Sequence, residues 1–439
     1  MRGFFNLAVA SATAFFAQTI AAPMPIVVTP GDKGDLIITQ ENTVNHTSNA
    51  LPPNMTIKEY SPLTISLVNN FGGSQLYVYV TGNDPSGAVV MLSTDGTWYY
   101  PDAAGSQVPV AITANVANPM NAQGQTTEIT LPDYLSSGRI WIAEGELQFF
   151  TVLAGDGTSQ LVEPSAANPS DPSAAVNWGF VEFTNTEAGG IYANISFVDF
   201  VGLVTGMTLT LASGETQEVK GLSSGAIATI CQELKDQAAA DGQPWDQLCV
   251  TDASGNPLRI LAPNLYQSIN PTAQANYYDD YIEQVWQKYT NEDLTINTQA
   301  DAGSVACRVN GDELTCAGDN RGYPRPTVAD IWGCNSGPFG IQDGDNAVHQ
   351  AVVPRLCAAF FRTTLLLDGG NVQPSLSSDS YYTADPTNHY SRIVHKYELD
   401  GKGYTFSYDD VNPDGENQAG VVAGLQPQVL QLTVGGFSS

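Results

Sequence analysis

The chain has 439 residues, of which 42% are hydrophobic, so it can fill the cores of two or three domains. Its 45 acidic residues outnumber 16 basic ones, and the net charge of −29 opposes binding to nucleic acid or to an anionic membrane surface. We therefore expect a neutral or cationic partner, such as a polysaccharide whose hydroxyl groups hydrogen-bond to carboxylates, or simply a soluble secreted protein.

The N-terminus predicts export. Arg2 precedes the apolar run "FFNLAVASATAFFAQTIAA", whose small final residues are typical of a signal peptide over residues 1–21. Residues 22–61 are rich in Pro and Thr and predict an extended lead-in. No later run stays apolar over the roughly 18 residues that a membrane span needs, and N-glycosylation sequons begin at Asn45, Asn54 and Asn194. The expected localisation is therefore secreted and extracellular.

Residues 62–205 consist of short apolar or alternating runs separated by turn residues, such as "LTISLVNN", "QLYVYVTG" and "RIWIAEG", and predict an all-β barrel or sandwich domain. Helical spacing follows in "SSGAIATICQELKDQAAADG", "NYYDDYIEQVWQKYTN" and "VVPRLCAAFFRTTLLL". Residues 206–387 are therefore a predicted mixed α/β domain. The strand-like runs "YTFSYDD" and "VLQLTVGGF", within about 388–437, are expected to complete the β domain. The predicted fold class is mainly β with an α/β part.

The six cysteines are even in number and confined to the predicted α/β domain, which favours an oxidising compartment. Sequential pairing would join Cys231 to Cys249, Cys307 to Cys316, and Cys334 to Cys357. Six cysteines allow fifteen connectivities, and we expect the sequential one. Metal binding is less favoured, because the spacing contains no CxxC pair and no His lies beside the cysteines at ligand spacing.

The segment "GLSSG", residues 221–225, matches the G-x-S-x-G elbow of serine hydrolases and lies between a strand-like run and a helix. A triad would also need a downstream His, and the chain offers His349, His389 and His395. The surrounding pattern is not the strand–helix repeat that carries this elbow. We therefore favour Ser223 or Ser224 as the N-cap of the helix.

The segment "DVNPDG", residues 410–415, places oxygen-bearing side chains at the first, third and fifth positions of a calcium loop, with Gly at the sixth. The twelfth position is Val421, where a bidentate Glu is needed. We therefore interpret the segment as a turn and predict no metal or other cofactor.

Two carboxylates lie within the apolar runs of "VEFTNTEAGGIYANISFVDF", residues 181–200. In a regular hairpin Glu182 would face about Ala193, and Asp199 would lie on the order of 20 Å further along. Inverting glycoside hydrolysis needs two carboxyls roughly 6.5–9.5 Å apart, so a wide loop or bulge would have to bring them together. From spacing alone, a solvated sheet face is the simpler interpretation.

The same stretch resembles glycoside hydrolase family 64, the laminaripentaose-producing β-1,3-glucanases related in fold to thaumatin-like proteins. The resemblance begins with "VEFT" and "YANISFVDFVGL" and extends in order through "LVNNFGGSQLYVYVTG", "ICQEL", "DGQPWDQLCV", "YIEQVWQKY", "CNSGPF" and "HYSRIVHKYELDGKGYTFSYDD". It covers nearly the whole chain from about Leu63 to Phe437. It implies a thaumatin-like β-barrel or sandwich domain joined to a mixed α/β domain, with a wide groove between them for β-1,3-glucan.

The resemblance also implies the site residues. Glu182 would be the general acid and Asp199 the general base of a cofactor-free, inverting endo-β-1,3-glucanase. Thr184, Tyr192, Asn194 and Ser196 would line the groove and contact sugar hydroxyls. The expected partner is β-1,3-glucan, such as laminarin, curdlan or cell-wall glucan, and the expected state is a monomer. The alternative is a non-catalytic thaumatin-like protein that binds β-1,3-glucan in the same groove.

Overall fold

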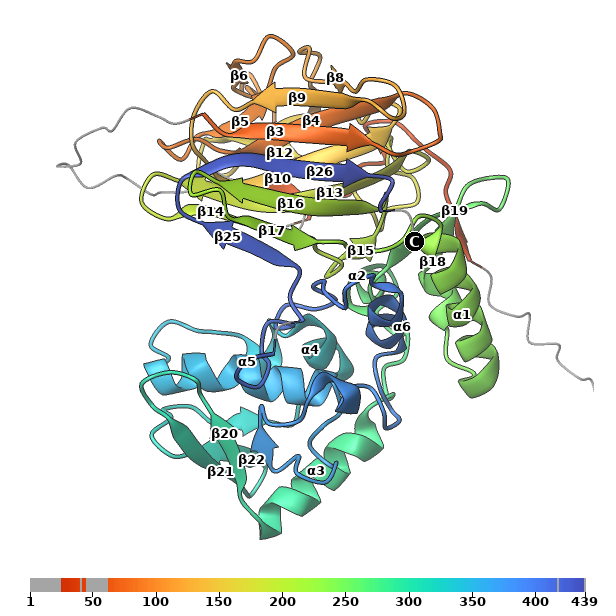
Figure 1. Ribbon diagram of the computed structural model, residues 1–439. Helices are drawn as coiled ribbons and strands as arrows, with labels where there is room; N and C mark the ends of the chain where they lie inside the picture. Colours follow the sequence, from red (N-terminus) through yellow and green to blue (C-terminus); the bar gives the residue numbers. More distant parts are fainter. Residues whose placement is uncertain (1–24, 40–41, 45–61, 417, 438–439) are drawn as a thin grey trace, which may run out of the picture.

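The computed structural model describes residues 25–39, 42–44, 62–416 and 418–437 (Figure 1). The expected signal peptide and the sequons at Asn45 and Asn54 lie outside the described residues. Strands hold 31% of the residues and helices 19%, which confirms the prediction of a mainly β fold. In Figure 1 the large sheets form the upper part of the molecule, and most helices lie with one small sheet in the lower part.

The largest sheet has eight strands and carries the predicted site. Its main path runs in the order β25, β14, β13, β10, β4, β5, β6, and β8 pairs with β4. Every described pairing in this sheet is antiparallel. The strands are β4 (Leu76–Asn83), β5 (Val89–Leu92), β6 (Trp98–Tyr99), β8 (Asn118–Pro119), β10 (Leu135–Glu144), β13 (Asn177–Thr186), β14 (Gly190–Asn194) and β25 (Val421–Gly424).

A second sheet of five strands packs against this one. Alternate residues of the two sheets, among them Val80, Ile140, Val181, Leu209 and Leu432, are fully buried in one common apolar core. This is the alternation expected of strands with one buried face. The strands, in sheet order, are β17 (Thr216–Val219), β16 (Thr205–Leu211), β26 (Pro427–Val434), β3 (Thr64–Asn69) and β9 (Thr126–Thr130).

Of the predicted barrel or sandwich, the structure has the sandwich, because the two sheets are open layers that do not close into a barrel. The main path of the eight-stranded sheet ends at β25 and β6, which do not pair with each other in the described structure. Short strands with frequent turns are typical of sandwiches and barrels alike, so the sequence pattern could not distinguish the two. The predicted boundary near residue 205 falls at the start of β16, and β16 and β17 continue the five-stranded sheet.

Two small sheets join the N-terminal segment to the rest of the chain. β1 (Ile26–Val27) pairs in parallel with β18, and β2 (Thr43–Val44) pairs with β12. The first sheet has the order β1, β18 (Cys249–Thr251), β19 (Pro257–Leu261), β15 (Phe200–Val201). The second has the order β2, β12 (Ser159–Val162), β11 (Phe150–Leu153), β7 (Val110–Ala111).

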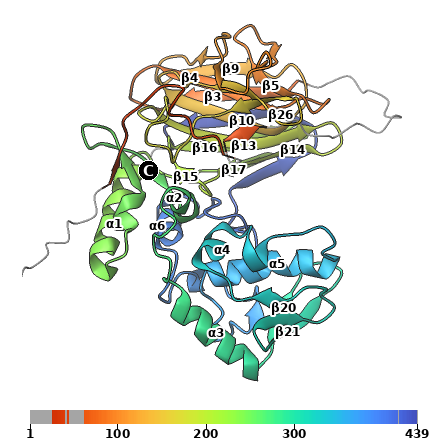
Figure 2. The ribbon, with the colours of Figure 1, turned by 180° about the vertical axis from the view of Figure 1, so that it is seen from behind.

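The helices gather below the large sheets, as Figure 2 shows from behind. They are α1 (Ala226–Asp241), α2 (Pro263–Ile269), α3 (Asp279–Asn291), α4 (Val328–Gly333), α5 (Ala347–Phe361) and α6 (His389–Tyr397). Three short 3₁₀ turns are Trp245–Leu248, Gly337–Phe339 and Ser378–Ser380. A five-stranded sheet lies among them, in the order β23 (Tyr323–Pro324), β22 (Glu313–Cys316), β21 (Ser304–Asn310), β20 (Leu294–Asn297), β24 (Val372–Gln373). No helix in the described ranges is long and apolar enough to cross a membrane.

The three disulfides join Cys231 to Cys249, Cys307 to Cys316, and Cys334 to Cys357. The prediction of sequential pairing is therefore confirmed. Each bridge closes a local loop and links neighbouring elements: α1 to β18, β21 to β22, and the end of α4 to α5.

Two local predictions are wrong. The N-cap of α1 is Gly225, whose φ of 81° suits a residue without Cβ, and no serine side chain caps this helix. The strand expected at "YTFSYDD" is absent from the described structure, where residues 404–410 form turns and Tyr404 makes a single bridge to Ser196. The reason is local: the Thr405 N–H and hydroxyl both donate to Asp409 Oδ2, which competes with strand pairing.

Candidate active site

The hairpin of β13 and β14 presents the predicted site residues on one face of the eight-stranded sheet. Along β13, Val181 and Phe183 are buried in the core, while Glu182 and Thr184 are partly exposed on the opposite face. This alternation is the ordinary consequence of a strand's two-residue period. The side chain of Glu182 remains 34% exposed, so its carboxylate is open to solvent.

The register brings four of the six predicted residues together. Glu182 lies opposite Asn194, and Thr184 lies opposite Tyr192. The sequence predicted that Glu182 would face about Ala193, and the observed partner is one residue further along the chain. Directly opposed residues of an antiparallel pair share a face, so all four side chains lie on the face of Glu182. Tyr192 is 45% exposed, which leaves a large aromatic surface free for contact.

Asp199 is not on the continuation of β14. The strand ends at Asn194, and the chain then bends, so that the backbone C=O of Asp199 accepts a hydrogen bond from the N–H of Ala262 and the next strand, β15, pairs with β19. The obstacle posed by a regular hairpin, in which Asp199 would be carried far along the strand, therefore does not arise.

Arg139 on β10 is the group that links the two acids, and the sequence analysis missed it. Its Nε and Nη2 both donate to Glu182 Oε1, at 3.3 and 3.2 Å. Arg139 and Asp199 line one small pocket together with Trp141, Phe180 and Phe200. The one signal in the sequence was a single cation inside the apolar run "RIWIAEG" of a chain poor in basic residues.

Glu163 lies behind Arg139 and was also missed. Arg139 Nη1 donates to Glu163 Oε2 at 2.7 Å, and the Thr81 hydroxyl donates to Glu163 Oε1 at 2.9 Å. Trp141 Nε1 in turn donates to the Thr81 oxygen at 3.0 Å. Both oxygens of Glu163 therefore accept hydrogen bonds. The side chain is only 1% exposed, so Glu163 itself does not reach the open face.

The charges in this cluster act on one another. Burial opposes the charge of Arg139, but Glu163, Glu182 and Asp199 outweigh it and raise the pKa of the guanidinium. Burial raises the pKa of Glu163, while Arg139 and Thr81 act in the opposite direction. Arg139 therefore stays a cation, shared by a buried carboxylate on one side and by the two exposed candidates on the other.

A second pair of residues supports the far side of the face. The hydroxyls of Tyr192 and Tyr404 are hydrogen-bonded at 3.0 Å, and Ser196 forms a backbone bridge with Tyr404. Ser196 Oγ also accepts from the Val198 N–H at 3.4 Å. Tyr404 is largely buried, so it fixes the position of the exposed Tyr192 ring from beneath.

The turn that carries Tyr404 is held by a buried ionic network. His395 lies between two carboxylates, with Nδ1 2.8 Å from Glu398 Oε2 and Nε2 3.1 Å from Asp409 Oδ2. Burial opposes its protonation, but the two carboxylates raise the pKa of His395 to about 10. Although burial acts against it, His395 and then Arg362 lower the pKa of Asp409 to about 2. The network is charged at neutral pH and ties α6 to the turn.

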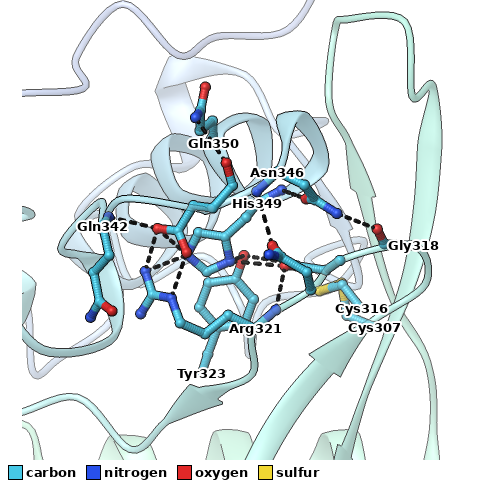
Figure 3. Close-up of polar contacts among 12 residues, drawn as sticks. Cys307, Cys316, Gly318, Arg321, Tyr323, Gln342, Asn346, His349 and Gln350 are labelled. Atoms are coloured by element: carbon cyan, nitrogen blue, oxygen red, sulfur yellow. Dashed lines mark hydrogen bonds and ion pairs between the residues drawn. A yellow bond between two sulfur atoms is a disulfide. The ribbon is translucent and has the colours of Figure 1, made fainter.

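His349, a possible triad member in the serine-hydrolase hypothesis, belongs to another buried cluster (Figure 3). Its Nδ1 lies 2.9 Å from Asp319 Oδ1, and its Nε2 lies 2.7 Å from Arg321 Nη2. Its ring stacks on Tyr323 at 4.9 Å between centroids. Its described partners include no serine. Ser224 instead lines a hollow with Asn70 and Gly435, and no histidine is among the described lining residues. The structure therefore gives no support to a triad.

The segment considered for calcium forms a turn. Gln299 Nε2 donates to the Asn412 carbonyl at 2.9 Å and to Asp414 Oδ1 at 3.1 Å. Val421, the twelfth position, begins β25. Within the part of the chain that the structure describes, no group of three or more His, Cys, Asp or Glu side chains is arranged to hold a metal ion.

The open β-sandwich places Glu182 and Asp199 beside one arginine, a pair of carboxyl groups suited to acid–base chemistry. Comparison with known proteins identifies the family. The model of the β-1,3-glucanase family, glycoside hydrolase family 64, matches residues 61–434. The chain belongs to this family.

Individual relatives agree with this assignment. A glucan endo-1,3-β-glucosidase of Cellulosimicrobium cellulans is 27% identical over 373 residues, which are 82% of this chain and 64% of that protein, so the chain spans less than two thirds of its length. The crystal structure of a laminaripentaose-producing β-1,3-glucanase in complex with laminaritetraose matches with a TM-score of 0.74 and 28% identity, over 85% of this chain and 98% of that one. A β-1,3-glucanase domain from Clostridium beijerinckii has the same fold, with a TM-score of 0.67 and 21% identity, over 86% of this chain and 100% of that one.

Proposed function

We propose that the protein is a secreted endo-β-1,3-glucanase that hydrolyses β-1,3-glucan with inversion and releases short oligosaccharides. The observation that carries this proposal is that Arg139 hydrogen-bonds to Glu182 and lines one pocket with Asp199, in a chain of the β-1,3-glucanase family. The similarity to a laminaripentaose-producing enzyme that was crystallised with laminaritetraose supports the substrate class and a short product.

In the proposed mechanism Glu182 protonates the glycosidic oxygen as the bond to the anomeric carbon breaks. Asp199 takes a proton from water, whose oxygen attacks that carbon from the opposite face. One water is consumed and one reducing end is formed for each bond broken, and the anomeric configuration inverts. Glu182 suits the acid role because Arg139 binds only Oε1. In the described part of the chain no donor contacts Oε2, so that oxygen is free to carry and deliver the proton.

The residues around Glu182 suit a neutral sugar polymer. Thr184, Asn194 and Ser196 offer hydroxyl and amide groups to sugar hydroxyls, and the exposed ring of Tyr192 can stack on a pyranose face. A glycan on Asn194 would obstruct this face, so we expect its sequon to be unused.

We further propose a thaumatin-like architecture, with a wide groove between the large sheets and the helical region below them. The position of Asp199 supports this proposal, since it lies where the chain leaves the eight-stranded sheet and approaches α2, whose Leu265 lines the same pocket. The three disulfides support an oxidising, extracellular destination.

The test is incubation of the purified protein with laminarin or curdlan, followed by chromatography of the soluble products. We expect short oligosaccharides from the wild type, and almost none from Glu182→Gln, which should still bind the polymer. Glu187→Gln is the matched control, because it removes an exposed carboxylate from the turn of the same hairpin and should keep full turnover. Retention of polymer without any product from the wild type would instead support the non-catalytic glucan-binding alternative.

A further inference from the structure

We propose that Glu163 is a positioning residue that acts through Arg139 and sets the pH range in which Glu182 and Asp199 work. This inference rests on the proposed function. It assigns a role to a third carboxylate, one that is buried and does not touch the substrate.

The geometry makes Arg139 the only described cation that is shared among the three carboxylates. Its Nη1 faces Glu163 at 2.7 Å, whereas its Nε and Nη2 face Glu182 at 3.3 and 3.2 Å. Asp199 borders the same pocket. The contact of Arg139 with Glu163 is shorter and more buried than its contact with Glu182. The negative charge of Glu163 therefore offsets much of the electrostatic attraction between Arg139 and the acids of the open face.

This division matters because a general acid must hold a proton. A full guanidinium charge beside a carboxylate favours its charged form, which opposes the role of a general acid. Glu163 weakens that effect while leaving the two hydrogen bonds that orient Glu182. It can do so because its own position is fixed: Thr81 donates to its carboxylate, and its backbone N–H donates to the Asn42 carbonyl at 2.8 Å.

The groups around the two acids come from several elements. Arg139 is on β10, Glu163 follows β12, and Asp199 precedes β15. The neutral Thr184 is on β13, Asn194 and Tyr192 are on β14, and the buried Tyr390 of α6 interacts with Asp199. Of these, Glu163 is the one charge that can be removed without altering a residue on the open face, since it is only 1% exposed.

The experiment is the pH dependence of kcat/KM on laminarin for the wild type and for Glu163→Gln. Removing the buried charge leaves the positive charge of Arg139 to the acids of the open face, and a neighbouring cation favours the charged form of a carboxylate. We expect the whole bell-shaped profile to move to lower pH by about one unit. KM near the new optimum should stay within about threefold of the wild-type value, because Glu163 does not touch the sugar. An active, folded Glu163→Gln enzyme with an unmoved profile would overturn the proposal.

Two further variants keep the result interpretable. Glu163→Asp withdraws the carboxylate from Arg139 by one methylene, so it should give a smaller shift in the same direction; if Glu163→Gln does not fold, this variant carries the test. Asp345→Asn removes one carboxylate from a different buried arginine pair, Arg321 and Asp345, and should destabilise the fold without moving the profile. An equal shift in Asp345→Asn would also overturn the proposal, since it would trace to net charge. An inactive wild type would count against the proposed function instead.

Discussion

The clusters around Arg139 and Arg321 each contain an arginine paired with a carboxylate, and they differ in the next residue that joins the pair. Arg139 and Arg321 are equally exposed, at 22% and 23%, and each is paired with a buried carboxylate, Glu163 or Asp345. In the Arg321 cluster the next groups are Asp319 and His349, which are 1% and 0% exposed and bound to each other (Figure 3). In the Arg139 cluster the next group is Glu182, which is 34% exposed.

The difference separates a closed structural cluster from the proposed active site. Asp319 accepts from the Tyr323 hydroxyl and the Arg321 N–H and contacts the His349 ring, so both of its oxygens are occupied. Glu182 has one oxygen held by Arg139 and, among the described residues, no donor on the other. A polar network that is fully satisfied stabilises a fold, whereas one with an open acceptor at the surface can bind or transfer a proton.

The largest expected effect is a loss of kcat on substitution in the Arg139 cluster but not in the Arg321 cluster. Asp199→Asn should lower kcat on laminarin by about 10²–10⁴-fold, the usual contribution of a general base, while binding of laminarin stays near the wild-type level. Asp319→Asn is the matched control from the closed cluster, and its folded fraction should keep kcat within about twofold. Comparable activity in the two variants would remove the distinction between the clusters.

For stability, we expect the larger effect from substitution in the Arg321 cluster. Arg321→Met leaves Asp345 and Asp319 without their cation, and should lower the free energy of unfolding because the carboxylates lose their compensating charge. Denaturant titration measures this loss, and activity assays at a temperature where the variant is folded should give wild-type kcat. An unchanged free energy of unfolding would show that the cluster contributes little to the fold.

A pH dependence of stability is expected from His395. Its pKa is about 10 in the folded chain against 6.5 ordinarily, so its charged pairing stabilises the fold fully below pH 6.5. That contribution is lost as the pH rises toward 10. A rise of this size in the folded-state pKa corresponds by linkage to a loss of several kcal/mol across the interval. The difference in Tm between the wild type and His395→Gln should narrow across this interval. A difference that is constant with pH would contradict the assigned charge.

The smallest effect concerns Tyr404. Tyr404→Phe removes the hydroxyl that positions Tyr192, and should raise KM for laminarin by about fivefold, which corresponds to roughly 1 kcal/mol for one hydrogen bond, with kcat nearly unchanged. Tyr408→Phe, in the same turn, is the control and should leave KM unchanged. A loss of kcat without a change in KM would mean that Tyr404 does not act through substrate binding.

Much of the fold could be predicted from the sequence because it depends on local pattern. The strands of the sandwich follow from alternation, α1 and α3 from helical spacing, and the disulfides from cysteines that are neighbours in the chain. Glu182 and Thr184 could be assigned to one face because a strand has a period of two. The strand predicted at 404–410 was wrong because the segment is held in turns by hydrogen bonds from Thr405 to the Asp409 side chain. The alternation of apolar and polar residues does not reveal such bonds.

The rest of the site depends on contacts that no local pattern contains. Glu163 directly follows β12, which pairs with β2 in a separate small sheet, and it contacts Arg139 only through the tertiary fold. The local sequence "LVEPS" contains no pattern that predicts this contact. Asp199 reaches the pocket because the chain leaves β14 after Asn194 and pairs with β19, whereas the sequence suggested an unbroken strand.

The anomeric form of the first product is the most direct test of the account. Two carboxylates that act on either side of the glycosidic bond, with water between Asp199 and the sugar, must yield the α-anomer from a β-linked glucan. Proton NMR of laminarin in the first minutes after addition of the wild-type protein should therefore show the α-anomeric signal growing before mutarotation supplies the β form. Early accumulation of the β-anomer would contradict the assigned roles of Glu182 and Asp199.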